Sequence, residues 1–361
     1  MQQEMDSRNQ AGQTSSVSNS CSSEVPASRD CSEVVEEKRK KETSDRLPAS
    51  VPKREEQSDI ISTVVRFLET HTAYDALPAS GKVSVFNSNM PICLAFECLR
   101  SQEVAEAIIW NHEKNCYIGI FNSSDLIKAV LMQINMHRHN PQSVDDILLI
   151  NINTYREFQL KQSKNSKRLL DCQPTTSLMD ILRIMSQYRI RRLPVIQDDQ
   201  ALGILTYSTI LYYLVSSFDK SSPIYKQTLR ELHLGVYKDV ISCPSSTPIA
   251  QALFMLESKN ISSILVTNDE GRMTTIFQRS DIFKLDIMDI SLFEKPLYAI
   301  PALNHKVPQV LCCKQDDSLQ YVFETFASTD LRLLVIVDDH DMPIGIISLV
   351  DLLNYFLTYI L

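Results

Sequence analysis

Glycine and tryptophan are scarce in this chain, whose 361 residues include seven glycines and one tryptophan. The sequence contains neither G-x-G-x-x-G nor G-x-x-x-x-G-K-[ST], so it lacks the glycine-rich loops that hold phosphates in dinucleotide-binding and P-loop folds. None of the nine cysteines forms a C-x-x-C pair, and no ligand spacing indicates a metal site. Scattered cysteines of this kind are typical of an intracellular protein.

The chain also lacks a strong positive charge and a long apolar run. Its net charge of −8 gives no electrostatic footprint for nucleic acid. The most apolar stretch, residues 345–361, is interrupted by Asp351 and Asn354 and is too short to span a membrane. No signal-peptide pattern opens the chain. We therefore expect a cytoplasmic protein that binds neither nucleic acid nor a membrane.

Aromatic residues are absent from residues 1–58, which contain twelve serines. Such a segment cannot bury enough apolar surface to offset its chain entropy, so we predict a disordered tail. The charged run EVVEEKRKK at 33–41 is interpreted as a solvated patch. A nuclear localisation signal, which would add the nucleus to the expected location, is the less favoured interpretation.

The rest of the chain contains one pattern four times. Each copy begins with apolar residues at i, i+3, i+4 and i+7, the spacing of one buried helix face. These positions are Ile92, Ala95, Phe96 and Leu99; Leu178, Ile181, Leu182 and Met185; Ile249, Ala252, Leu253 and Leu256; and Leu319, Val322, Phe323 and Phe326. Two strand patterns follow in each copy, and a second helix begins directly after the second of these strands.

We call the start of this second helix the elbow, and its positions are Asp125, Thr209, Asp281 and Asp351. The elbow follows the first apolar helix residue by 33, 31, 32 and 32 residues in the four copies, so one β-α-β-β-α unit is predicted four times. An aspartate that opens a helix is commonly a cap, which accepts a backbone N–H and contributes about 1 kcal/mol. Three aspartates at one repeat position also favour ligand binding, and the two roles can coexist.

The unit resembles the CBS motif, and four in tandem resemble the gamma regulatory subunits of AMP-activated protein kinase. Stretches outside the bare repeat carry the resemblance further: THTAYDALPASGKVSVF at 70–86, TYREFQL at 154–160, YRIRRLPVI at 188–196, LRELHLGVY at 229–237 and GIISLVDLL at 345–353. The resemblance implies an α/β fold in which CBS units pair, 1 with 2 and 3 with 4, into two modules that form a disk. The implied segments are a tail at 1–58, a lead-in at 59–77, a linker at 139–164, and CBS units at 78–138, 165–227, 234–296 and 305–361.

The same resemblance implies a non-catalytic regulatory subunit that binds AMP, ADP or ATP between paired CBS units, with no prosthetic group or metal. The implied partners are the alpha (catalytic) and beta (scaffold) chains of a kinase heterotrimer. In the family, elbow carboxylates hold the ribose and basic residues hold the phosphates, and the second elbow also lacks aspartate. The implied nucleotide-binding residues of this chain are Asp125, Arg191, Arg192, Ser262, Asp281, His305, Lys306, Arg332, Ser348 and Asp351.

The chain departs from the family where basic or hydroxyl side chains are expected. The departing positions hold Ala105 followed by Glu106, Ser208, Val236, Asn260, Leu333 and Val350. Because a charged hydrogen bond contributes about 1.5–3 kcal/mol, two such losses weaken a site about a hundredfold. We therefore expect Asp281 and Asp351 to matter more for binding than Asp125, whose site contains Glu106. A degenerate CBS scaffold with weak or no nucleotide sensing is the alternative; an enzyme is not supported, because no nucleophile–base pair or metal cluster is evident.

Overall fold

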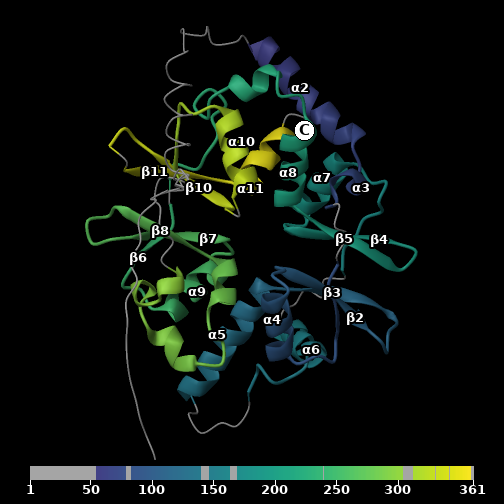
Figure 1. Ribbon diagram of the computed structural model, residues 1–361, viewed down its shortest axis with the longest axis vertical. Helices are drawn as coiled ribbons and strands as arrows, with labels where there is room; N and C mark the ends of the chain where they lie inside the picture. The colour runs from purple at the N-terminus through teal and green to yellow at the C-terminus, as the bar shows by residue number, and fades with distance from the viewer. Residues whose placement is uncertain are drawn as a thin grey trace, which may run out of the picture. The chain divides into compact units, whose positions relative to one another are not determined.

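The computed structural model describes residues 54–78, 83–139, 146–162, 169–238, 240–303, 312–329, 331–340 and 342–358 (Figure 1). Two lead-in helices, α2 (Arg54–Thr70) and α3 (Ala73–Ala76), precede four repeats of the predicted unit. Because α2 begins at Arg54, residues 54–58 of the predicted tail are helical, which corrects that part of the prediction. The remainder of the predicted tail lies outside the described residues. No helix in the described ranges is both long and apolar enough to cross a bilayer.

Each repeat forms a small sheet, in which a short first strand runs parallel to the second and the second and third form an antiparallel hairpin. The strands are β1 (Val85–Asn87), β2 (Glu106–Asn111) and β3 (Cys116–Asn122); β4 (Arg192–Gln197) and β5 (Gln200–Thr206); β6 (Ser242–Pro244), β7 (Ser263–Thr267) and β8 (Met273–Gln278); and β9 (Cys312–Lys314), β10 (Leu333–Val337) and β11 (Pro343–Ser348). In repeat 2 the first strand is reduced to a bridge between Cys172 and Val195. The hairpin register shifts at the same point in all four repeats, which supports a common unit.

The first helix of each repeat lies where the apolar spacing predicts it. These helices are α4 (Ile92–Ser101), α7 (Leu178–Gln187), α9 (Ile249–Ser258) and α10 (Leu319–Ser328). Their predicted apolar positions are buried. Ser177 and Ser318 cap α7 and α10 by accepting the backbone N–H three residues later, at 3.0 and 3.3 Å. The sequence pattern therefore locates both the buried face and, in two copies, the start of the helix.

The second helix starts at the elbow in three repeats, as α5 (Ser123–His139), α8 (Tyr207–Ser217) and α11 (Leu349–Leu357). In repeat 3 the chain forms only a short 3₁₀ helix, η2 (Arg279–Lys284). Asp286 stands there at the fifth position after the elbow, where the other copies have an apolar residue. An apolar face cannot continue through that carboxylate, so the helix ends early. Three further 3₁₀ turns follow, η3 (Ile290–Glu294), η4 (Leu297–Ala299) and η5 (Pro301–Leu303).

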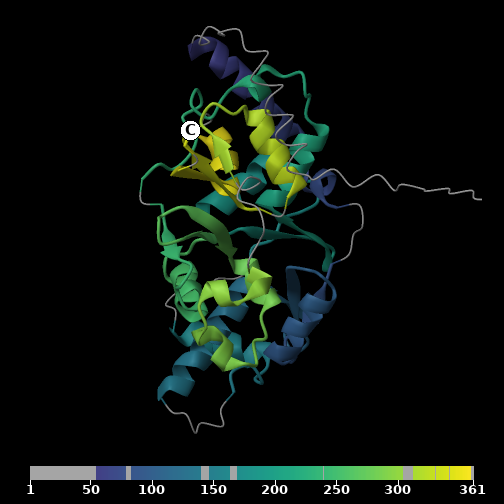
Figure 2. The same cartoon turned by 60° about the vertical axis from the view of Figure 1, so that its left-hand side comes forward.

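Sheets join repeats 3 and 4, and helices join the two modules. Leu265 and Ile276 of repeat 3 pack with Leu333 and Val335 of repeat 4 in one buried cluster, which confirms the predicted pairing of these units. The two sheets lie next to each other in both views (Figures 1 and 2). Helix α5 packs on α9 and η2, α10 packs on α8, and α11 packs on α7 and α8. One core cluster consequently spans repeats 1 and 3. The arrangement of all four units as a disk stays a prediction.

Linker segments pack directly on the sheets, and two of the scarce glycines permit this contact. A Cβ atom at Gly345 would lie 2.7 Å from the ring of Tyr237 and 3.0 Å from the carbonyl oxygen of Val236. Gly119 is covered in the same way by Arg156, whose Nη2 donates to the Ile118 carbonyl at 2.8 Å. Arg156 belongs to helix α6 (Ile152–Gln162) in the linker between repeats 1 and 2. The stretches TYREFQL and LRELHLGVY are therefore integral parts of the fold.

Candidate functional site

All four elbows form the same capping contact, in which the elbow side chain accepts the backbone N–H of the residue three positions earlier. The N···O distances are 3.1 Å for Asp125, 2.8 Å for Thr209, 2.7 Å for Asp281 and 3.2 Å for Asp351. Because Thr209 makes this bond with a hydroxyl, capping does not require a carboxylate. Capping alone therefore does not account for the three aspartates.

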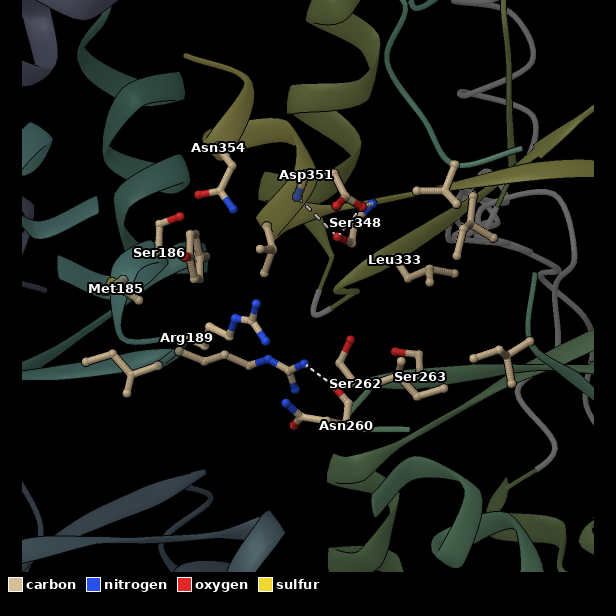
Figure 3. Close-up of a pocket in the computed structure, with 18 of the residues that line it drawn as sticks. Met185, Ser186, Arg189, Asn260, Ser262, Ser263, Leu333, Ser348, Asp351 and Asn354 are labelled. Atoms are coloured by element: carbon tan, nitrogen blue, oxygen red, sulfur yellow. Dashed lines mark hydrogen bonds between the residues drawn. The ribbon is translucent and has the colours of Figure 1, made fainter. Parts of the chain in front are cut away.

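A cavity of about 530 Å³ lies beside the fourth elbow (Figure 3). Ser348, Asp351 and Asn354 of repeat 4 form one wall, and Asn260 and Ser262 of repeat 3 lie on the opposite side. Both contacts from Ser348 reach Oδ2 of Asp351, so Oδ1 can accept from a ligand hydroxyl. Sites for small molecules commonly have volumes of about 300–1,000 Å³. The cavity therefore has the size and the acceptor needed for a ligand that carries hydroxyl groups.

The cationic side of this cavity comes from repeat 2, where Arg189 and Arg191 line it. Arg189 lies two residues after the end of α7, in the left-handed region at φ +51°, and the N–H of Ile190 donates to the Met185 carbonyl at 2.9 Å. Arg191 donates from Nη2 to the carbonyl oxygen of Asn260 at 2.8 Å, which joins repeat 2 to repeat 3. A guanidinium has five N–H groups, so Arg191 can hold this carbonyl and still donate to a ligand.

Positive charge is concentrated next to the cavity. Burial and the charges of Arg279 and Arg332 lower the pKa of Arg191. The same causes, with Arg332 ahead of Arg279, lower the pKa of Arg192 to about 9. A smaller cavity of about 30 Å³ adjoins the first at Arg191 and Ser262, and Arg332 lines it. Crowded cations favour an anion placed among them, so this end of the site suits a phosphate group.

The first and third elbows differ from the fourth. Asp281 is 1% exposed and pairs with Lys284, one turn later, at 2.7 Å. Burial raises the pKa of Asp125, and the charges of Arg156 and Lys128 oppose that rise only in part. Neither aspartate lines the cavity at the fourth elbow. Lys128 and Lys284 each stand three residues after their elbow, and repeat 4 has the neutral Asn354 at this position.

The structure brings together only part of the predicted set of nucleotide-binding residues. Arg191, Ser262, Ser348 and Asp351 line the larger cavity, and Arg332 lines the smaller one. Arg192 does not line either cavity and instead forms an ion pair with Glu106 of repeat 1. Asp125 and Asp281 lie at their own elbows, and His305 and Lys306 lie outside the described residues.

Arg189 and Asn354 are among the cavity residues that were not assigned from the sequence. Arg189 belongs to the same basic stretch as Arg191, and this stretch could have indicated it. The resemblance to the family, however, matches Arg191, which stands two positions later. Asn354 stands one helical turn after the elbow, and that spacing could have identified it. Four departures from the family, Val236, Asn260, Leu333 and Val350, also line this cavity.

Comparison with known proteins finds CBS domains in this chain. The family model of the CBS domain matches residues 166–216, 231–287 and 306–358. Repeat 1 lies outside these matches but has the same strand pairing in the structure. A protein from Methanocaldococcus jannaschii, considered an archaeal homologue of the gamma subunit of AMP-activated protein kinase, has a similar fold, with a TM-score of 0.65 over 79% of this chain and 100% of that one at 14% identity. Three segments of the chain thus match the CBS domain, and the fold is of the α/β class, as predicted.

The chain is also similar to the gamma subunits of 5'-AMP-activated protein kinase, which confirms the predicted resemblance. It is 28% identical to the gamma subunit of Dictyostelium discoideum over 306 residues, or 81% of this chain and 52% of that protein. It is 28% identical to the gamma-3 subunit of Homo sapiens over 304 residues, or 80% of this chain and 60% of that protein. The chain spans between half and two thirds of the length of these relatives.

Proposed function

We propose that the chain is a non-catalytic regulatory subunit that binds one adenine nucleotide in the cavity at Asp351 and regulates a kinase chain. The observation that carries this proposal is the placement of the Asp351 carboxylate opposite Arg189 and Arg191 in one cavity of about 530 Å³. A nucleotide presents ribose hydroxyls, which donate hydrogen bonds, and phosphates, which accept them from guanidinium groups. The two ends of the cavity match these two ends of the ligand.

The parts of the nucleotide have separate places in this proposal. The ribose hydroxyls donate to Oδ1 of Asp351, and the phosphate lies between Arg191 and Ser262. Ile241 and Leu265 provide apolar lining for the base. Only adjustment of side chains is then needed for binding, because the walls come from three repeats that the sheets and helices already hold together.

A cytoplasmic location stays a prediction. The partners proposed for this subunit are the alpha and beta chains of the kinase complex. Their support is the similarity to curated gamma subunits of 5'-AMP-activated protein kinase. Co-expression with alpha and beta chains, followed by size-exclusion chromatography, tests the assembly. Co-elution of the three chains is expected, and a chain that elutes alone would contradict the regulatory role.

Calorimetric titration of the full chain with AMP, ADP and ATP tests the site. We expect one binding event, which Asp351→Thr weakens about tenfold or more, because a charged hydrogen bond contributes about 1.5–3 kcal/mol. Threonine is chosen because Thr209 shows that it preserves the cap. Asp339→Thr, at a 91% exposed aspartate of the same repeat, is the matched control and should change nothing. Equal binding by the wild type and Asp351→Thr would refute this placement of the ribose.

A degenerate CBS scaffold is the second candidate function. It is favoured by Asn260, Leu333 and Val350, which line the cavity where the family has basic or hydroxyl residues. Leu333 and Val350 offer the ligand no hydrogen-bond donor, and Asn260 offers an amide donor without a charge. A chain that assembles with the kinase but binds none of the three nucleotides in the calorimeter would establish this candidate.

A further inference from the structure

Glu106 and Arg192 form an ion pair where repeats 1 and 2 meet. Glu106 begins β2 and Arg192 begins β4, and their side chains are 14% and 13% exposed. Charges withdrawn from water to this extent are stable only while paired, because breaking the pair leaves an uncompensated charge behind. The contact therefore fixes the position of Arg192 in the folded chain.

The surroundings of this pair are strongly cationic. Burial, and then the charges of Arg332 and Arg279, lower the pKa of Arg192. Arg279 has its own acidic partner, Glu257, at 2.8 Å. Among the ion pairs of the described residues, Glu106 is the carboxylate that balances Arg192. A ligand phosphate that approached Arg192 would have to displace that carboxylate.

The geometry connects this pair to the proposed nucleotide site. The larger cavity adjoins, at Arg191 and Ser262, the smaller one of about 30 Å³, which Arg332 lines. That volume holds about one or two water molecules. A first phosphate can lie at Arg191, and further phosphates directed toward Arg332 would approach Arg192, whose pKa burial and the charge of Arg332 lower.

We propose that Glu106 is an internal anion that occupies Arg192 in place of ligand phosphate and so makes this chain discriminate against nucleoside di- and triphosphates. The proposal rests on the proposed function, because it assumes that the ribose lies at Asp351. Added phosphates meet an arginine whose charge is already balanced and a carboxylate that repels them. The monophosphate reaches neither group and is unaffected.

Titration of the full chain and of Glu106→Gln with AMP and ATP tests this role. Glutamine keeps the size of the side chain and removes its charge. We expect ATP to bind Glu106→Gln about tenfold more tightly than it binds the wild type, while the AMP affinity changes less than about threefold. In Glu106→Gln/Arg192→Gln the gain for ATP should disappear. Glu97→Gln, which removes an exposed glutamate of the same repeat that pairs with Arg100, should leave both affinities unchanged.

Inorganic tripolyphosphate separates this inference from the proposed function. The wild type should bind it weakly and Glu106→Gln about tenfold more tightly, whether or not a nucleoside is recognised. Failure of the wild type to bind AMP would contradict the proposed function alone. Equal affinities of the wild type and Glu106→Gln for tripolyphosphate, with both chains showing the same cooperative thermal unfolding, would overturn the role of Glu106.

Discussion

The elbows of repeats 3 and 4 share an aspartate and a capping contact, yet only the fourth opens onto the described cavity. In repeat 3, Lys284 reaches back one helical turn and pairs with Asp281 at 2.7 Å. In repeat 4, the same position holds Asn354, which has no charge. The residue three positions after the elbow thus distinguishes the two repeats. A lysine there pairs with the elbow carboxylate, whereas an asparagine leaves the carboxylate able to accept a ligand.

The position two residues before the elbow shows the same division of roles. Leu349 stands there in repeat 4, whereas repeat 3 has Arg279, which is 7% exposed. Arg279 donates to the carbonyl oxygens of Leu256 and Ile261 at 2.6 and 2.7 Å and pairs with Glu257 at 2.8 Å. It therefore fixes the third elbow to the end of α9. One copy of the repeat uses its elbow to hold the fold together, and the other leaves it available for binding.

The largest expected effect concerns the arginine that holds the third elbow. Arg279→Met keeps an unbranched side chain but removes every one of these hydrogen bonds and leaves Glu257 with less compensation. We expect the free energy of unfolding to fall by about 3–5 kcal/mol, measured by urea denaturation. Arg272→Met, at a 70% exposed arginine of the same repeat, is the control and should change stability by less than about 0.5 kcal/mol. A loss below about 1 kcal/mol would show that the third elbow is not a structural centre.

The next effect contrasts Asp281 with Asp351: substitution of Asp281 should affect stability and not AMP binding. Asp281→Thr preserves the cap in the manner of Thr209 but removes the partner of Lys284, so we expect a loss of stability of about 1–3 kcal/mol. AMP affinity should change less than twofold, in contrast to Asp351→Thr. Urea denaturation and calorimetry on both variants measure the contrast. Equal weakening of AMP binding by the two substitutions would restore the original sequence prediction that both aspartates bind nucleotide.

The sequence predicts the fold in more detail than the site because the two depend on different kinds of signal. Apolar spacing at positions such as Ile92 and Leu319 is repeated four times and reports burial directly, so helices and strands are located to within a few residues. The helix lost in repeat 3 is also visible, at Asp286. The site depends on pairing across repeats. That Glu106 meets Arg192, or that Arg191 reaches Asn260, follows from the packing of distant segments and has no local pattern.

A smaller effect tests the comparison at the position three residues after the elbow. Asn354→Lys reproduces the arrangement of repeat 3, so the new ammonium group should pair with Asp351 and compete with the ribose. We expect AMP binding to weaken about tenfold, with stability unchanged or raised by about 0.2–0.5 kcal/mol. Asn354→Ala is the control, since it removes the amide without adding a charge, and should weaken binding less than threefold. Similar losses in both variants would mean that the amide itself binds the ligand.

The smallest effect concerns Asp125, the elbow that is neither closely paired like Asp281 nor open like Asp351. Burial raises the pKa of Asp125, so the folded state favours the protonated carboxyl more than the unfolded state does. The stabilising contribution of this group is then complete below the unfolded pKa of about 3.8 and is lost as the pH rises through the higher folded pKa. The substitution Asp125→Asn would mimic the protonated form and retain a cap, because asparagine also accepts a backbone N–H.

The stability of the wild type relative to Asp125→Asn should therefore fall over the pH range from the unfolded pKa of about 3.8 up through the higher folded pKa. Urea denaturation of both chains across this range measures the difference, and Thr209→Ser, an elbow without a titrating group, is the control. A relative stability that rises with pH would show that Arg156 and Lys128 outweigh burial and favour the ionised form. Asp125 would then be a carboxylate paired with nearby cations, as Asp281 is with Lys284. Asp351 would differ from both aspartates for the same reason, because its own helix has no cation three residues later.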